Sequence, residues 1–279
     1  MSRRQRQMCI RDRFLGFAVS LIPFSYAISS LRLNDYKSWI APAKKWLVLS
    51  IIILGIGIMM GAYWAYETLN FGGYWNWDPV ENAVYVPWLF LVASLHSIIL
   101  TQKNRQYYKM SLILSFVSFI LILYSTFLTR SGILGDSSVH SFTDLGLSGQ
   151  LLIYLFTFIS IGIYLFIIRW KKIPFSEKET KIYNADFWLY IGVFTLILMS
   201  FQVIFPTSIP VYNAIVEFFG GFSNLAPPIE KEIFYSNAQI WFASSLAILS
   251  SIAQVLWWRG KEANEKFSLF SRSLILTMA

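Results

Sequence analysis

Seven long apolar stretches run through the sequence, and they constrain its fold more than any other feature. A bilayer core of roughly 30 Å requires about 20 residues of helix. The stretches are Phe14–Leu31, Trp46–Thr68, Val84–Thr101, Met110–Thr129, Gln150–Ile168, Asp186–Phe205 and Ala238–Trp258. The first is short and contains Pro23, and Leu274–Ala279 resembles the start of an eighth. We therefore predict an all-α, polytopic integral membrane helix bundle of about seven transmembrane helices.

Composition excludes several other classes of protein. Hydrophobic residues make up 56% of the chain and charged residues only 14%, whereas soluble domains carry about 25% charged residues. Such an apolar chain is neither soluble nor disordered. A single cysteine, Cys9, excludes a disulfide scaffold and a cysteine-rich zinc site. The net charge of +8 does not indicate nucleic acid, because in a membrane protein the basic residues report orientation.

Lysine and arginine alternate between the connecting segments. Sixteen of them lie in four segments, which are Arg32–Lys45, Lys103–Lys109, Arg169–Lys181 and Arg259–Arg272. The segments between these hold only Arg130 and Lys231. The positive-inside bias then places the basic segments in the cytoplasm. Three segments face outward, and these are Glu67–Val86, Arg130–Gly149 and Pro206–Asn237.

The N-terminus contradicts this map. Met1–Arg13 carries five arginines at an end that one preceding span would place outside. Either Phe14–Leu31 does not span, or the first residues are foreign to the protein. We predict a non-native basic tail over residues 1–13, a membrane domain over residues 14–258, and a cytoplasmic segment that leads into a further span over residues 259–279.

The outward segment Glu67–Val86 is rich in aromatic residues. Phe71, Tyr74, Trp75 and Trp77 surround the pair Gly72-Gly73, with no lysine or arginine among them. Isolated rings are common at membrane interfaces. A cluster around glycines also offers flat apolar faces to a large planar ligand, because glycine allows close approach of the backbone.

Asp78-Pro79-Val80-Glu81 follows this cluster and has the pattern of a helix start. Aspartate at the N-cap, proline at the first helical position and glutamate two residues later predict a capping box. A helix N-terminus is also a place where an anionic group docks, so the structural and ligand-binding interpretations are compatible.

Two histidines and one arginine are the remaining candidates. His140 lies in an outward segment, and His96 lies inside the apolar stretch Val84–Thr101. An ionisable residue at that depth faces the bundle interior and needs a partner, which is either a neighbouring helix or haem iron, a common partner of imidazole. Arg130 either snorkels to the interface or pairs with a carboxylate of a ligand.

Two motifs resemble a known family. The run from Gly72 to Ala83, which reads GGYWNWDPVENA, is similar to the WWD signature of the haem-handling proteins of cytochrome c biogenesis, most of all the CcmF-type haem lyase subunit. Residues 130–134, RSGIL, followed by residues 139–142, VHSF, resemble the histidine loop after the WWD segment. The resemblance extends from Phe14 to about Trp258 and weakens after Gly149.

The resemblance implies two haem b sites. The outer haem would lie on the WWD loop, with His140 as an axial iron ligand, and His96 would ligate a second haem inside the membrane. The residues expected to hold the outer haem are Gly72, Gly73, Tyr74, Trp75, Trp77, Asp78, Glu81 and Arg130. The family has further haem-ligating histidines that this chain lacks, which leaves one ligand for each haem and leaves the chain's own enzymatic activity open.

The resemblance also implies a function in cytochrome complex assembly. The parent protein would lie in the bacterial inner membrane and present haem on its periplasmic face for thioether attachment to the Cys-x-x-Cys-His motif of apocytochrome c. Its partners would be apocytochrome c, the haem-delivery and thiol-handling subunits of a maturation complex, and membrane lipid, but no nucleic acid. The alternatives are a haem exporter or delivery protein without lyase chemistry, a quinol-linked haem reductase and a purely structural assembly subunit.

Overall fold

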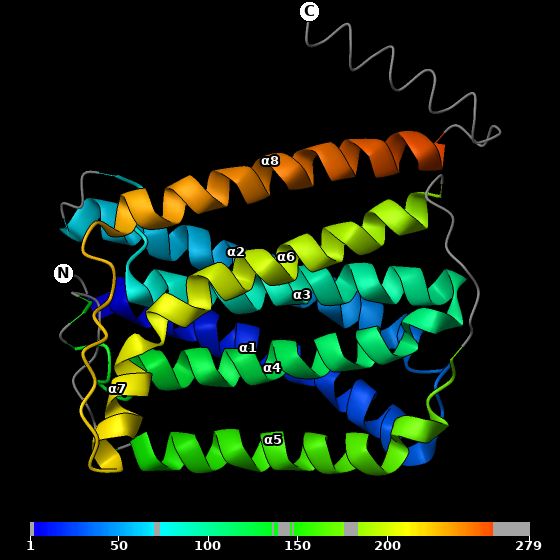
Figure 1. Cartoon of the computed structure of the whole chain (residues 1–279), viewed down its shortest axis with the longest axis horizontal. Coiled ribbons are helices and arrows are strands. Elements are labelled where there is room, and N and C mark those ends of the chain that lie inside the picture. The colour runs from blue at the N-terminus through cyan, green and yellow to red at the C-terminus, as the bar shows by residue number, and fades with distance from the viewer. Residues whose placement is uncertain are drawn as a thin grey trace, which may run out of the picture.

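The protein is a bundle of helices in a computed structural model, which describes residues 3–69, 73–135, 137–138, 146, 148–175 and 184–258 (Figure 1). All the regular secondary structure among these residues is helical. The α-helices are α1 (Arg3–Leu33), α2 (Ile40–Leu69), α3 (Pro79–Lys103), α4 (Tyr108–Arg130), α5 (Ser148–Arg169), α6 (Ala185–Thr207), α7 (Ile209–Phe218) and α8 (Lys231–Trp258). Two 3-10 turns, η1 (Arg105–Tyr107) and η2 (Trp170–Lys172), adjoin α4 and α5.

Six of the seven predicted spans are helices long and apolar enough to cross a membrane. They are Ile40–Thr68, Pro79–Lys103, Arg105–Arg130, Ser148–Lys172, Ala185–Thr207 and Lys231–Leu256. The remaining predicted span, Phe14–Leu31, lies within α1. The apolar part of α1 that the structure describes, Ala18–Leu33, is shorter than the other six spans. The predicted all-α, multi-pass architecture is confirmed, and the count of seven is approximate. Leu274–Ala279 lies outside the described residues.

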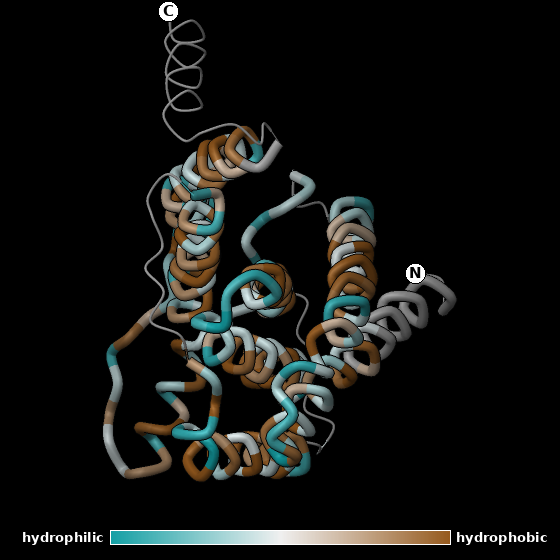
Figure 2. The backbone as a smooth tube through the Cα atoms, turned by 90° about the vertical axis from the view of Figure 1, so that its right-hand side faces the viewer, coloured by the Kyte–Doolittle hydropathy of each residue, from teal (hydrophilic) through white to brown (hydrophobic). Residues whose placement is uncertain are grey.

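The connections alternate between the two ends of the bundle. α3 and α8 begin, and α4 ends, at the end where α7 lies across the bundle (Figure 1). This groups the three segments that we predicted to face outward, and we call it the outer end. The short helix α7 lies within the outward segment Pro206–Asn237. Figure 2, viewed from the opposite end, shows hydrophobic helices joined by hydrophilic connections.

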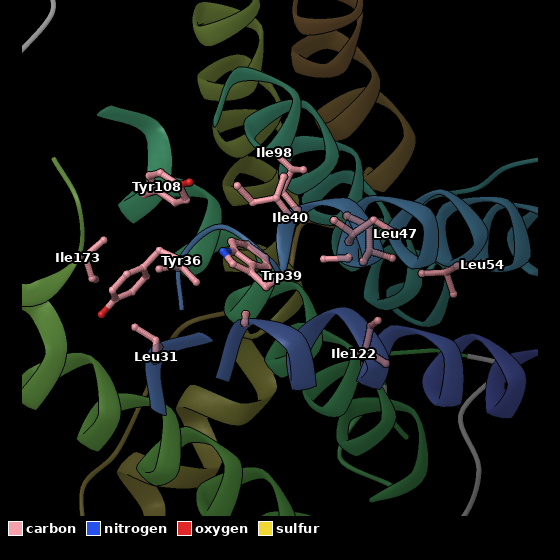
Figure 3. Close-up of a cluster of buried hydrophobic side chains, with 14 residues drawn as sticks. Leu31, Tyr36, Trp39, Ile40, Leu47, Leu54, Ile98, Tyr108, Ile122 and Ile173 are labelled. Carbon is pink, nitrogen blue, oxygen red and sulfur yellow. The ribbon is translucent and has the colours of Figure 1, made fainter. Parts of the chain in front are cut away.

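α3 and α4 form the centre of the bundle. α3 packs against α2, α4 and α6, whereas α8 packs mainly against α6 and contacts α3 through a few side chains, such as Gln239 with Tyr85. In the most apolar part of each span, 61% of the residues are buried in α3 and 67% in α4, compared with 6% in α8. A cluster of buried side chains joins α1, α2, α3 and α4 (Figure 3), and it includes Leu31, Trp39, Leu47, Ile98, Leu112 and Ile122.

Small residues allow close contact between these central helices. The hydroxyls of Ser94 on α3 and Ser115 on α4 lie 2.9 Å apart and are buried. Serine and glycine let helices approach closely in lipid, where packing and hydrogen bonds replace the hydrophobic driving force. Gly162 on α5 likewise lies directly against the ring of Phe116 on α4, 1.9 Å from where a Cβ would be.

Candidate functional site

The N-terminus of α3 forms the predicted capping box. The Asp78 carboxylate accepts a hydrogen bond from the Val80 amide at 3.1 Å. The Glu81 carboxylate reaches back to the amides of Asp78 at 3.3 Å and Asn76 at 3.1 Å. Both side chains are buried. The helix start therefore uses both carboxylates and also fixes the turn that precedes it.

Trp77 adopts an unusual backbone conformation in that turn. Its φ angle is +53°, a left-handed conformation that costs a residue other than glycine about 1–3 kcal/mol. Three contacts hold it there. The indole Nε1 donates to Ser236 Oγ at 2.9 Å, the carbonyl accepts from Asn82 Nδ2 at 3.1 Å, and the ring stacks on Tyr235.

The indole of Trp77 is the centre of an aromatic cluster. It stacks on Tyr235 with ring centroids 5.3 Å apart, and it meets Trp75 at 5.7 Å and Tyr85 at 5.9 Å edge-on. Trp77 is only 9% exposed. In this conformation it serves packing and offers no open face, so its direct contact with haem stays a prediction.

The other predicted platform residues are arranged differently. Trp75 is half-buried, and its buried Nε1 has no hydrogen-bond acceptor among the described residues. Tyr74 is exposed, and its hydroxyl donates to the Met59 carbonyl of α2 at 2.7 Å. The carbonyl of Gly73 accepts from the Asn76 side chain at 3.4 Å. Gly72 lies outside the described residues.

Asn82 joins α3 to α6 beneath this cluster. It is fully buried, and its Nδ2 donates to Thr207 Oγ1 at 3.2 Å as well as to the Trp77 carbonyl. Thr207 in turn lies 3.4 Å from the Tyr235 hydroxyl of α8. We call the segment from Gly73 to Asp78 the aromatic turn, or WWD turn. It is held in place by contacts that involve α3, α6 and α8.

The segment after α4 is bound to the same place. Arg130 is half-buried at the C-terminal end of α4. Further along, the Ser138 hydroxyl donates to Oδ2 of Asp78, and Nζ of Lys231 on α8 donates to the Ser137 carbonyl at 2.6 Å. His140 lies outside the described residues, two positions after Ser138.

His96 lies far from this group, in the inner half of α3. The helix begins at Pro79. Because each helical residue adds about 1.5 Å, His96 lies about 25 Å along the helix from that start. Its Nδ1 lies 2.7 Å from the Val92 carbonyl. The ring borders a cavity of about 190 Å³ between α3, α6 and α8, lined by Trp188, Gly192, Leu196, Leu246 and Ser250 among others.

The structure thus divides the predicted site residues into two groups. The first comprises the aromatic turn, the capping carboxylates and the segment that leads to His140, all at the outer end. The second is His96 with its cavity. Among the described residues, neither group contains a cluster of three or more metal-ligating side chains.

Sequence reasoning missed the residues that hold the first group together. Tyr235, Ser236 and Lys231 belong to the first turns of α8, more than 150 positions after Trp77 in the case of Tyr235 and Ser236. No local pattern connects them to the aromatic turn. Asn82 could have been found from the sequence. It is a polar amide directly after the capping motif, at the start of a helix that we expect to be buried.

Comparison with known proteins gives a consistent result. Residues 13–134 match the family described as cytochrome C assembly protein. The cytochrome c-type biogenesis protein CcmF of Haemophilus influenzae is 30% identical over 88% of this chain and 37% of its own length. The CcmF of Escherichia coli is 29% identical over the same shares, and the biogenesis protein ccl1 of Rhodobacter capsulatus is 28% identical over 95% of the chain and 40% of its own length.

A solved structure shares the fold. It is named cytochrome c heme lyase CcmF, and it superposes with a TM-score of 0.66 at 24% identity over 91% of this chain and 36% of that chain. The chain therefore spans well under half the length of these relatives. Residues 13–134 therefore match the cytochrome C assembly protein family, and over most of its length the chain is similar to part of the CcmF-type cytochrome c biogenesis proteins.

Proposed function

We propose that this chain holds haem at its outer end during cytochrome c maturation, as the haem-binding part of a CcmF-type haem lyase. The single observation that carries the proposal is the hydrogen bond between Ser138 and Asp78. Asp78 belongs to the WWD motif, and Ser138 lies between residues 130–134 and residues 139–142 of the second motif, so the bond attaches the segment that leads to His140 to the start of α3.

Ser138, which is attached to the N-cap of α3, comes two positions before His140 in the sequence. We propose that His140 serves as an axial ligand of a haem at the aromatic turn. The family's second ligand for that iron would come from elsewhere in the assembled protein.

The residues at the outer end suit the chemistry of haem. The indole Nε1 of Trp75 is buried and has no acceptor among the described residues, a situation that costs about 1–3 kcal/mol. An acceptor on a ligand, such as a propionate, would remove that cost. The ring of Trp75 stays half-buried and edge-on to Trp77 and Tyr85, so it can cover an apolar macrocycle.

His96 suits a second haem in its donor chemistry. A ring N–H at Nδ1 bonded to the Val92 carbonyl leaves Nε2 as the free acceptor, which is the arrangement found in metal-ligating histidines. The adjacent cavity of about 190 Å³ is smaller than the roughly 300–1,000 Å³ of typical ligand pockets. A macrocycle at His96 would therefore require α6 and α8, which pack against each other, to move apart.

In this function the chain's own residues bind and orient. The capping box and the Ser138 bond hold the turn rigid, the aromatic rings exclude water, and Arg130 would pair with a propionate. Bound haem supplies the vinyl groups that a lyase joins to the two cysteine thiols of apocytochrome c. We further propose that the outer end faces the periplasm, since its three connecting segments hold only two basic residues, and that the haem-delivery and thiol-handling subunits dock there.

Haem spectra of the purified protein in lipid nanodiscs test the proposal. His140→Ala should remove the outer haem and spare the membrane haem, and His96→Ala should do the reverse. Ser141→Ala, next to His140, is the control and should leave both spectra unchanged. If neither histidine variant alters haem content or ligation, the assignment of both sites is wrong.

Reconstitution with apocytochrome c separates the candidate functions. A covalent product formed by the assembled complex supports a lyase, whereas transfer of haem without thioether bonds identifies a delivery protein or exporter. A quinol-linked haem reductase is the second candidate, because the cavity beside His96 lies between membrane helices. Reduction of haem by a quinol analogue, lost in His96→Ala, would support it.

A further inference from the structure

The first turns of α8 contact both halves of the candidate outer site. Tyr235 stacks on Trp77, and Ser236 accepts the hydrogen bond from its indole. One turn earlier, Nζ of Lys231 donates to the Ser137 carbonyl at 2.6 Å. A single helix N-terminus therefore binds the aromatic turn on one side and the segment before His140 on the other.

These contacts are notable because α8 is otherwise peripheral. Along its length it packs mainly against α6, and 6% of the residues in its span are buried. In lipid, a helix with so little packing gains its position from specific contacts. At the outer end, Lys231 and Tyr235 line one small proline-rimmed recess together with Trp77 and Ser137.

Lys231 is also exceptional by charge. It is one of only two basic residues in the three outward segments, the other being Arg130. Its ammonium is half-buried and bonded to a backbone carbonyl, a charge-assisted bond stronger than one between neutral groups. Basic residues are rare in the outward segments, and the ammonium group of this lysine donates to one backbone carbonyl. Its specific partner is therefore Ser137.

We propose that Lys231 is a positioning residue, which fixes the segment before His140 against the WWD turn and so sets the geometry of the outer haem ligand. The inference rests on the proposed function. Lys231 of α8 binds the Ser137 carbonyl, and the next residue, Ser138, binds Asp78 at the start of α3. Two adjacent residues of the segment are therefore held from opposite sides.

The test measures the segment and the haem separately. Hydrogen exchange of the haem-free protein in nanodiscs reports the opening of residues 130–142. Lys231→Met should accelerate exchange of this segment about tenfold through loss of the charged bond, and Lys231→Arg should restore most of the protection. Glu232→Gln, on the exposed neighbour in the same helix turn, is the control and should leave exchange unchanged.

The second measurement is the spectrum and reduction potential of bound haem. Lys231→Met should shift both for the outer haem, leave the His96 haem unchanged, and regain wild-type values in Lys231→Arg. Unchanged exchange in Lys231→Met overturns the inference, and so does faster exchange with an unaltered outer haem. If the wild-type protein binds no outer haem, the proposed function fails and the positioning role fails with it, while the exchange result still decides whether Lys231 anchors the segment.

Discussion

The ring of Tyr235 lies stacked on that of Trp77, with centroids 5.3 Å apart and planes inclined by 26°. The two residues come from the first turns of α8 and from the turn before α3. Because Trp77 has a left-handed backbone, its ring needs a partner that holds it in place. The stack thus joins the last described helix to the motif on which the family resemblance rests.

We predict that Tyr235→Ala destabilises the protein by on the order of 3 kcal/mol, since it removes a fully buried ring. Tyr235→Phe keeps the stack and should cost less than about 1 kcal/mol. Unfolding by denaturant in detergent micelles measures both. Trp241→Ala, on a side chain of the same helix that is 75% exposed, should have little effect; equal losses in the two alanine variants would contradict a role for the stack.

The bond between Ser138 and Asp78 predicts energetic coupling between residues 60 positions apart. In a double-mutant cycle of Asp78→Ala and Ser138→Ala, we expect a coupling energy of about 1–2 kcal/mol, because the acceptor is a carboxylate. Asp78→Ala alone should also lose the helix cap, about 1 kcal/mol.

A parallel cycle with Ser131→Ala serves as the control. Ser131 accepts from the Ile133 amide, so its loss should add to that of Asp78 within about 0.5 kcal/mol. Additivity in the Ser138 cycle as well would show that the segment is not attached to the helix start.

The cavity beside His96 can be filled without disturbing the fold. A Cβ on Gly192 of α6 meets no atom within 4 Å, and Gly192 lines the cavity. We predict that Gly192→Leu abolishes haem binding at His96 while thermal stability stays equal or rises, since leucine is a better helix former than glycine by up to about 1 kcal/mol.

Gly61→Leu is the matched control for that substitution, because a Cβ there also meets open space but on α2. Optical spectra of the two variants in nanodiscs decide the outcome. A full complement of membrane haem in Gly192→Leu would place that haem elsewhere.

Gly162 of α5 tests the packing of the bundle independently of haem. A Cβ there would lie 1.9 Å from the ring of Phe116, so we predict that Gly162→Ala destabilises the protein by about 1–3 kcal/mol through overpacking. Gly162→Ala combined with Phe116→Leu should recover part of the loss. A wild-type melting temperature in the single variant would mean that α4 and α5 are packed less closely than the structure shows.

Local signals predicted much of the fold. Length and hydropathy identified the spans, the basic residues identified which connections share an end, and the letters DPVE identified the capping box at Asp78 and Glu81. Each depends on residues adjacent in the chain or on a property summed over a window. The apolar stretch of α3 begins at Val84, but the capping pattern predicted a helix start at Pro79, and the helix does begin there.

Only the tertiary structure could decide which faces meet. Helices that are apolar on every side carry no stripe that names a partner, and in lipid the choice is made by shape and by a few hydrogen bonds. The sequence by itself determined that a tryptophan-rich turn precedes a capped membrane helix, with a histidine segment further on. That Trp77 turns inward against Tyr235, that Lys231 reaches Ser137, and that His96 borders a cavity between α6 and α8 followed only from the packing of helices far apart in the chain.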